Sequence, residues 1–218
     1  ARGYSRRAGS RRVLYAMPSG AARNAVDCAL WDLEAKATGR RVAQLVCRGM
    51  PSALETAFTL SLGSAAAMED QARKHAHRPL LKIKLGTDGD VERMEAVRKA
   101  APNARIIVDA NEGWTVKNIR QNIDAAAKFG ITLIEQPLPA DNDALLRELS
   151  HQVRLCADES LHEAADLDKL VGLYDAINIK LDKAGGLTAA LELRDRARAL
   201  GFQIMVGCMV GTSLSMAP

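Results

Sequence analysis

The chain has 218 residues and a formal net charge of +4, and 48% of its residues are hydrophobic, enough for one sizeable core. No apolar run is long enough to cross a bilayer, so the sequence predicts no membrane span and no membrane partner. Its four cysteines lie far apart without a CxxC pair, which argues against a zinc ribbon or a disulfide scaffold and is typical of a cytoplasmic protein.

The positive charge is concentrated at the N-terminus. Five arginines lie among the first twelve residues, and the rest of the chain has a net charge of −1. A nucleic-acid-binding protein carries its basic patch on the folded domain, so we expect no nucleic-acid partner. We interpret residues 1–17 as an arginine-rich tail or the remnant of a preceding domain, with a transit peptide or a nucleic-acid arm as alternatives. The five arginines are Arg2, Arg6, Arg7, Arg11 and Arg12.

Residues 18–218 are predicted to form one domain that begins with a helix within 18–48. Ser19 is the expected N-cap of this helix and Gly39 its expected end. Asp27 and Asp32 are expected on its solvated face. The apolar residues that recur at helical spacing are Ala22, Val26, Ala29, Leu30 and Leu33.

From residue 56 onward, strand and helix patterns alternate seven times. Continuous apolar strands with helices between them indicate a parallel sheet that is buried on both faces. Strands are predicted at 56–62, 81–86, 105–111, 131–137, 153–160, 176–180 and 203–207. Helices are predicted at 65–77, 90–99, 116–129, 143–150, 164–173 and 185–200.

Charged residues recur at the ends of five of these strands, at intervals of 22 to 26 residues, about one βα unit each. These residues are Lys84, Asp109, Glu135, Asp158 and Lys180. In a (β/α)₈ barrel the carboxyl ends of the strands meet at one mouth, where active sites are built. A doubly wound sheet would alternate similarly, but no glycine-rich phosphate loop follows the first strand. We therefore predict an α/β fold, an incomplete TIM-type (β/α) barrel with seven βα units visible and the eighth missing.

Three of these residues are carboxylates, which repel one another when they converge. Asp109, Glu135 and Asp158 are therefore predicted to hold a divalent cation. Oxygen ligands without histidine or cysteine favour Mg²⁺ over Zn²⁺. The alternative is that each carboxylate caps a helix N-terminus.

Lysines flank the predicted metal site from two strands. Lys82 and Lys84 point to the same side of their strand because side chains alternate with period 2. Lys180 lies four strands later, roughly opposite in an eight-stranded barrel. Two lysines on opposite faces of one carbon permit proton removal on one face and return on the other, through an enediolate that the cation stabilises.

These residues resemble motifs of the enolase superfamily, in its muconate-lactonising subgroup, and most closely those of dipeptide epimerases. The resemblance covers residues 18–218. The motifs are Lys82-x-Lys84, Asp109-Ala110-Asn111, Glu135-Gln136-Pro137, Asp158-Glu159-Ser160 and Asn178-Ile179-Lys180 followed by Gly185-Gly186.

The resemblance implies a role for each matching residue. Lys84 and Lys180 would be the two acid/base catalysts, and Lys82 would contact the substrate carboxylate. Asn111 would lie close to the Mg²⁺ ion that Asp109, Glu135 and Asp158 hold. Asp182 is a candidate substrate-binding residue, because its side chain would point to the same side as that of Lys180 if that strand continued. The alternatives are that Asp182 orients a lysine or caps the next helix.

The resemblance also implies a function. It favours Mg²⁺-dependent epimerisation of a dipeptide of the L-Ala-D/L-Glu type, a small-molecule substrate. The alternatives are an o-succinylbenzoate synthase, an N-acylamino acid racemase, a muconate-type cycloisomerase or a non-catalytic barrel. Superfamily members carry an N-terminal capping domain and an eighth βα unit. In this sequence we expect the capping domain to be largely absent and the eighth βα unit to be missing. Homo-oligomerisation stays open.

Overall fold

The computed structural model describes residue 14, residues 16–47, residue 49 and residues 51–218. The five N-terminal arginines and most of the predicted tail lie outside the described residues. The chain divides into two compact units. The first unit comprises residues 1–54, 161–168 and 178–218, and the second unit comprises residues 55–160 and 169–177.

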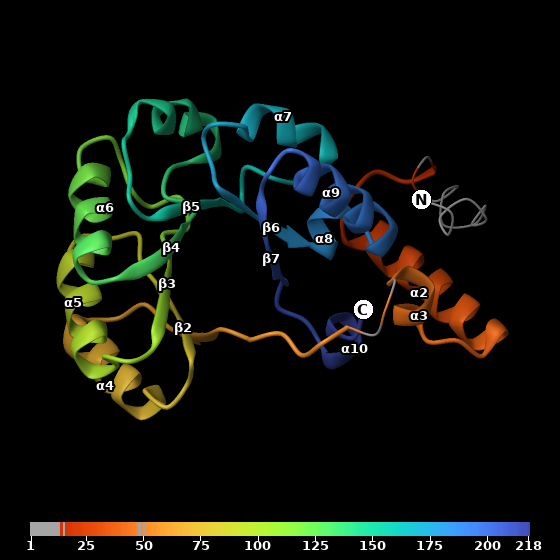
Figure 1. Ribbon diagram of the computed structural model, residues 1–218, viewed down its shortest axis with the longest axis horizontal. Helices are drawn as coiled ribbons and strands as arrows, with labels where there is room; N and C mark the ends of the chain where they lie inside the picture. The colour runs from red at the N-terminus through yellow and green to blue at the C-terminus, as the bar shows by residue number, and fades with distance from the viewer. Residues whose placement is uncertain (1–13, 15, 48, 50) are drawn as a thin grey trace. The chain divides into compact units, whose positions relative to one another are not determined.

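The second unit is built from alternating strands and helices (Figure 1). Its strands are β1 (Phe58–Leu60), β2 (Leu80–Lys84), β3 (Arg105–Asp109), β4 (Ile131–Glu135), β5 (Arg154–Ala157) and the start of β6 (Ala176–Lys180). Its helices are α4 (Ala65–His75), α5 (Asp90–Ala100), α6 (Ile119–Lys128), the 3₁₀ helix η2 (Ala140–Glu148) and the end of α7 (Leu167–Leu170).

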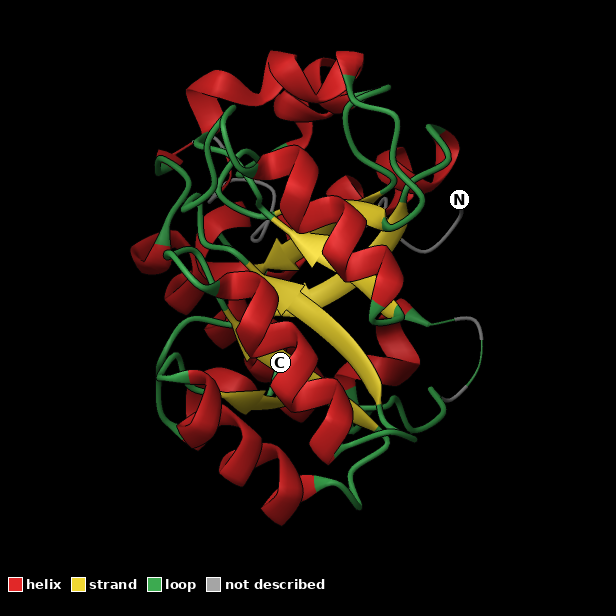
Figure 2. Cartoon of the chain, turned by 90° about the vertical axis from the view of Figure 1, so that its left-hand side faces the viewer, coloured by secondary structure: helices red, strands yellow, loops and turns green. Residues whose placement is uncertain are grey.

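The order of the strands in the sheet is their order in the chain, from β1 to β7. The pairs from β1–β2 to β5–β6 are parallel. A doubly wound sheet would reverse this order at a switch point. The uninterrupted order, with helices against the strands (Figure 2), confirms the prediction of an incomplete (β/α) barrel. Figure 1 shows α4, α5 and α6 together on one side of β2, β3 and β4.

The core of the second unit consists of aliphatic strand residues. In β2, Leu81 and Ile83 are fully buried, whereas the two lysines of that strand are partly exposed. In β3 the consecutive residues 106–108 are all buried, as expected for a parallel strand covered on both faces. The sheet therefore presents its polar groups mainly at the strand ends.

The first unit contains mostly helices. They are α2 (Ala21–Thr38), α3 (Val42–Val46), η3 (Ala164–Asp166), α8 (Leu181–Ala184), α9 (Leu187–Ala199) and α10 (Ser213–Met216), together with β7 (Gln203–Gly207). Gly39 ends α2 in the left-handed conformation, as predicted, with φ of 64°. The predicted N-cap was wrong: Gly20 occupies that position instead of Ser19, and it offers no side chain for capping.

The predicted orientation of α2 was wrong for Asp27 and for the apolar residues, whereas Asp32 is exposed as predicted. The helix buries Arg23, Asn24, Asp27 and Trp31, whereas Val26 is 41% exposed and Leu33 is 62% exposed. The amphipathic rule places apolar residues inside. It fails here because the buried polar groups hydrogen-bond to residues 182–188, which makes their burial tolerable.

Four predicted helices differ in detail. The helix expected at 116–129 begins at Ile119, because the Asn118 carboxamide accepts a hydrogen bond from the Thr115 amide and closes a turn. The helix expected at 164–173 is the 3₁₀ turn η3 followed by α7, and the one at 143–150 is the 3₁₀ helix η2. The helix expected at 185–200 is preceded by the short helix α8.

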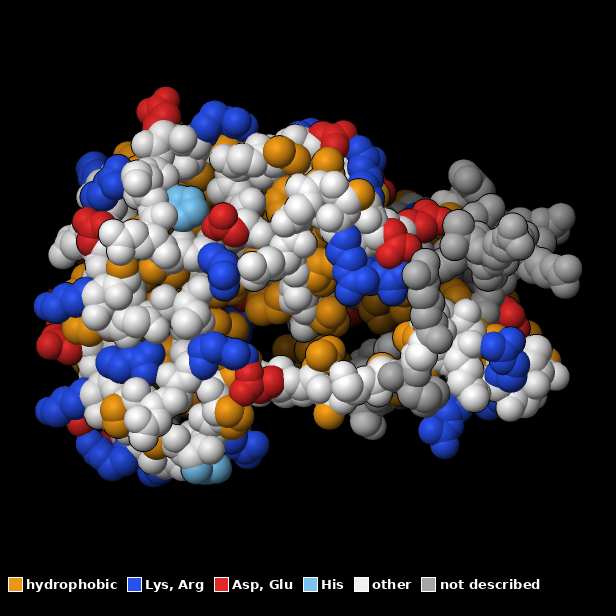
Figure 3. Space-filling model, in the orientation of Figure 1, with side chains coloured by type: hydrophobic (Ala, Val, Ile, Leu, Met, Phe, Trp, Pro, Cys, Tyr) orange, Lys and Arg blue, Asp and Glu red, His pale blue; other side chains and the backbone are white. Residues whose placement is uncertain are grey.

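In the part of the chain that the structure describes, no helix combines the length and the apolar character needed to cross a membrane. All four cysteines are free thiols, as the sequence predicted. Figure 3 shows basic and acidic side chains interspersed on the visible face.

Candidate active site

The sheet register aligns three of the predicted site residues. Lys84 at the end of β2 is opposite Asp109 at the end of β3, and Asp109 is opposite Glu135 at the end of β4. Asp158 directly follows Ala157, the last residue of β5. The prediction that these residues end neighbouring strands is confirmed, and all four belong to the second unit.

The three carboxylates are buried. Asp109 and Asp158 are each 1% exposed and Glu135 is fully buried. Burial raises the pKa of Glu135 to about 7, helped by the negative charge of Asp109, while Lys82 acts in the opposite direction. The cluster thus carries more negative charge than the surrounding protein readily accommodates.

Lys82 neutralises part of this charge. Its Nζ lies 2.5 Å from Glu135 Oε2 and 2.8 Å from Asp109 Oδ2, and its side chain is 15% exposed. Burial lowers the pKa of Lys82, but the charges of Glu135 and Asp109 outweigh it and hold that pKa above its ordinary value. Lys82 is therefore a permanent cation, suited to binding a carboxylate rather than to exchanging a proton.

Lys84 is the more accessible of the two lysines, with 34% of its side chain exposed. Its Nζ donates to Asp109 Oδ2 and to Asn111 Oδ1, both at 2.7 Å. The Asn111 amide donates to Asp109 Oδ1 at 3.0 Å, and its carboxamide donates to Glu159 Oε1 at 3.3 Å. Asn111 thus orients the Lys84 ammonium from a left-handed backbone conformation with φ of 43°.

Two glycines let the loops after β2 and β3 touch. A Cβ on Gly86 would come within 2.3 Å of the Ala110 carbonyl oxygen, and one on Gly113 within 2.3 Å of the Gly86 carbonyl oxygen. The buried Asp90 then accepts hydrogen bonds from the Gly86 amide and from Trp114 Nε1, both at 2.8 Å. The close approach of the two loops and the hydrogen bonds of Asp90 hold together the strand ends that carry Lys84 and Asp109.

Gln136 connects the ends of β4 and β5, a role that sequence reasoning missed. It is fully buried and has φ of 36°. Its Oε1 accepts hydrogen bonds from the Asp158 amide at 2.9 Å and the Ser160 amide at 3.1 Å. Its Nε2 lies within hydrogen-bond distance of Ser160 Oγ at 2.7 Å and of the Tyr174 hydroxyl at 3.0 Å. The only signal in the sequence was its place in the motif of residues 135–137.

We expect Gln136→Leu to destabilise the chain by about 2 to 4 kcal/mol, because two amides lose their acceptor without gaining water. Urea denaturation followed by circular dichroism measures this loss. The matched control is Gln152→Leu at an exposed position, which should change stability by no more than about 0.5 kcal/mol. A loss for Gln136→Leu as small as that of the control would show that Gln136 does not hold the two strand ends together.

The donor set fits a hard divalent cation. Asp109, Glu135 and Asp158 offer only carboxylate oxygens, which Mg²⁺ prefers, and their mutual repulsion is relieved by added positive charge. Among the described residues, no three His, Cys, Asp or Glu side chains are arranged as a metal centre, and the Lys82 ammonium contacts two of the predicted ligands.

The other two predicted site residues belong to the first unit. Lys180 is the last residue of β6, as predicted. Asp182 lies in the first turn of α8, so the strand does not continue and the condition for a shared facing with Lys180 is not met. Instead, Asp182 Oδ1 accepts a hydrogen bond from Asn24 Nδ2 at 2.8 Å. His162 is exposed in the loop after β5.

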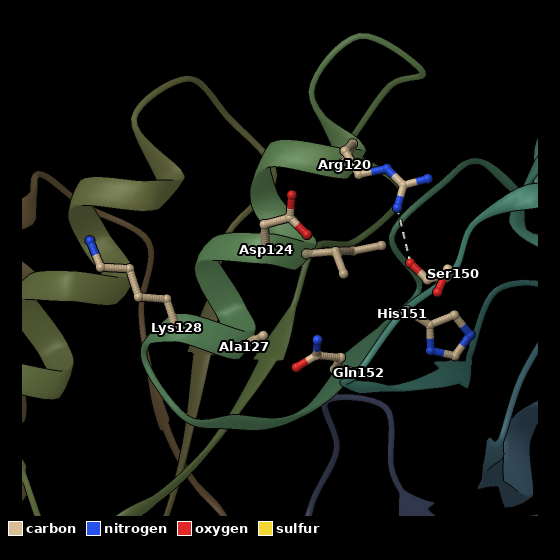
Figure 4. A pocket seen from close by; sticks show the side chains of 8 residues that line it. Arg120, Asp124, Ala127, Lys128, Ser150, His151 and Gln152 are labelled. Carbon is tan, nitrogen blue, oxygen red and sulfur yellow. Dashed lines mark hydrogen bonds between the residues drawn. The ribbon is translucent and has the colours of Figure 1, made fainter.

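A separate cavity of about 440 Å³ lies on the surface of the second unit, between α6 and the segment before β5 (Figure 4). Arg120 donates to the Ser150 carbonyl at 3.1 Å across it. The cavity contains none of the predicted site residues. Its lining consists of Arg120, Ile123, Asp124, Ala127, Lys128, Ser150, His151 and Gln152.

The strand order and the acidic strand ends define a barrel-type α/β protein with a polar site at its carboxyl edge. Comparison with known families identifies it further. Residues 64–218 match the enolase C-terminal domain-like family, and residues 6–47 match the mandelate racemase / muconate lactonizing enzyme N-terminal domain. The chain belongs to this family, which confirms the resemblance seen in the sequence motifs.

Individual relatives agree with this assignment. An N-acetyl-D-glutamate racemase from a Pseudoalteromonas species is 44% identical over 217 residues, covering 100% of this chain and 69% of the relative. The L-Ala-D/L-Glu epimerase of Escherichia coli K12 is 45% identical over 203 residues, covering 92% of this chain and 63% of that enzyme.

Solved structures share the fold. An enolase family member from Agrobacterium tumefaciens, described as homologous to dipeptide epimerases and as binding sodium and L-Ala-L-Glu, superimposes with a TM-score of 0.93. It is 56% identical, and the match covers 95% of this chain and 64% of that one. Other similar dipeptide epimerases are described as complexes with Mg and a dipeptide. The chain spans 69% and 63% of the length of the two curated relatives named above.

Proposed function

We propose that this chain carries the catalytic part of a Mg²⁺-dependent dipeptide epimerase of the L-Ala-D/L-Glu type. The observation that carries the proposal is the accessible Lys84 ammonium, held by Asp109 and Asn111 beside buried carboxylates at the ends of β3, β4 and β5. A carboxylate cluster beside a poised lysine is what removal of a proton next to a substrate carboxylate requires.

Asp109, Glu135 and Asp158 would hold the cation. When bound, the ion would supply positive charge that makes the α-proton of a carboxylate-bearing carbon more acidic. Lys82 would bind the substrate carboxylate as a permanent cation. Lys84 would take or return the α-proton on one face.

Lys180 would serve the opposite face of the same carbon. Support for this role comes from its position at the end of β6, from its match to the family motif and from the relatives named as epimerases and racemases. Epimerisation requires both proton transfers, and each lysine would remove the proton from one epimer only.

A second candidate is racemisation of an N-acylated glutamate. One relative whose match covers 100% of this chain is named an N-acetyl-D-glutamate racemase. The glutamate of L-Ala-Glu is also acylated on its amino group, so both reactions move the same kind of proton. The two functions differ in whether the site also recognises the free ammonium of the alanine.

The test is deuterium incorporation in D₂O. With Mg²⁺ present, we expect the α-proton of the glutamate in L-Ala-L-Glu to exchange and invert, observed by ¹H NMR. EDTA treatment should stop the reaction, because the carboxylate cluster would then lack its cation. Exchange of N-acetyl-D-glutamate at a rate that matches or exceeds that of the dipeptide would favour the racemase. Exchange of neither substrate would refute both functions for this chain.

A further inference from the structure

The buried polar face of α2 contacts the segment that follows Lys180, and both belong to the first unit. The face consists of Arg23, Asn24, Asp27 and Trp31, which are all at most 7% exposed. Each of these side chains hydrogen-bonds to a residue between 182 and 188. Four buried polar side chains with partners in one short segment indicate a dedicated contact rather than general packing.

Arg23 and Asp27 secure the two helix ends in this segment. Arg23 donates from Nε to the Gly185 carbonyl at 3.0 Å and from Nη2 to the Ala184 carbonyl at 2.8 Å, at the end of α8. Asp27 accepts from the Thr188 amide at 2.9 Å and from its hydroxyl at 2.7 Å, at the start of α9. A cation at a helix C-terminus and a carboxylate at a helix N-terminus both satisfy otherwise unpaired backbone groups.

The glycine pair in this segment fits against α2. A Cβ on Gly185 would come within 2.3 Å of Arg23 Nε, and one on Gly186 within 2.6 Å of Asp27. Their φ angles of 80° and 119° also disfavour side chains. The two glycines therefore allow the polar face of α2 to reach the backbone directly.

Asn24 provides the contact nearest to Lys180 in the chain. Its Nδ2 donates to Asp182 Oδ1 at 2.8 Å, and Asp182 lies two residues after Lys180, in the first turn of α8. The backbone passes directly from the end of β6 into α8 at Leu181, so a shift of Asp182 moves the strand end that carries Lys180.

We propose that Asn24 is a positioning residue for Lys180 and acts through Asp182, with the rest of the polar face of α2 holding the segment in place. The catalytic part of this proposal rests on the proposed function. The proposal gives α2, which is far from Lys180 in the sequence, a role in the proton transfer that Lys180 makes.

The test compares Asn24→Ala with the control Asp32→Ala at an exposed position of the same helix. In D₂O with Mg²⁺, α-proton exchange is measured separately for L-Ala-L-Glu and L-Ala-D-Glu. We expect Asn24→Ala to slow exchange about tenfold to a hundredfold for the epimer that Lys180 deprotonates, because misplacement of a catalytic group is this costly. The other epimer should exchange at the wild-type rate, and the control should affect neither.

Amide hydrogen exchange measured by mass spectrometry gives a readout that does not need activity. Amides of residues 181–188 should exchange faster in Asn24→Ala than in the wild type, whereas those of β3 should be unchanged. Unchanged exchange at 181–188, or equal slowing for both epimers, would overturn the proposal. If the wild type exchanges neither substrate, the proposed function and the catalytic part fail together, and the amide exchange still decides whether Asn24 holds the segment.

Discussion

Lys84→Ala and Lys180→Ala should each stop epimerisation of L-Ala-L-Glu, and each should leave α-proton exchange intact in a different epimer. The reason is that each lysine serves one face of the α-carbon, and the remaining lysine still exchanges its proton with solvent. Loss of a general base lowers the rate roughly a hundredfold to ten-thousandfold. ¹H NMR in D₂O, started from each epimer separately, measures exchange and inversion together.

Lys128→Ala is the matched control, because Lys128 is an exposed lysine of α6 that lines the surface cavity of the second unit. It should leave exchange of both epimers at the wild-type rate. If both active-site variants lost exchange of the same epimer, the two lysines would not serve opposite faces, and the mechanism would have to be replaced by one with a single base.

Glu135→Gln should abolish stabilisation by Mg²⁺ and, without metal, make the chain more stable than the wild type above pH 7. Mg²⁺ at a hundred times its Kd should stabilise the wild type by about 2.7 kcal/mol. The variant should show no such gain because it lacks one of three ligands. Thermal unfolding with EDTA and with Mg²⁺ measures both effects.

The sign of the metal-free effect follows from the pKa of Glu135, which burial and Asp109 raise from 4.5 to about 7. Since the folded chain holds this proton more tightly than the unfolded chain, stability is highest below pH 4.5 and falls as pH rises toward 7. Glutamine removes that loss, which is on the order of 3 kcal/mol for a shift of this size.

The control for this experiment is Asp124→Asn on the exposed side of α6, which should keep the full response to Mg²⁺. A Glu135→Gln variant that Mg²⁺ still stabilised like the wild type would remove Glu135 from the ligand set. A variant less stable than the metal-free wild type at pH 8 would show that the ion pair with Lys82 outweighs the repulsion in the cluster.

Much of the strand-end site could be predicted from the sequence because it depends on local periodicity. Apolar runs that end in a charged residue every 22 to 26 positions define successive βα units. Once the strands pair in chain order, Lys84, Asp109 and Glu135 must be neighbours, as the observed register shows. The alternation of side chains along β2 likewise predicted that Lys82 and Lys84 share a face.

The contacts that hold these residues could not be predicted in the same way. The role of Gln136 depends on amides 22 and 24 residues later in the chain. Whether the strand continues as far as Asp182 stayed open, because residues 180–182 alone do not show that α8 begins at Leu181.

The sequence by itself determined the order of the seven strands from residue 56 onward and the charged residues at their ends, because both follow from short-range patterns of apolar and charged side chains. Only the tertiary structure decided which face of α2 is buried. Asp27 is buried because Thr188, 161 residues later, supplies two hydrogen bonds to its carboxylate. Such a partner reverses the usual preference for burying the apolar face, and no local pattern reveals it.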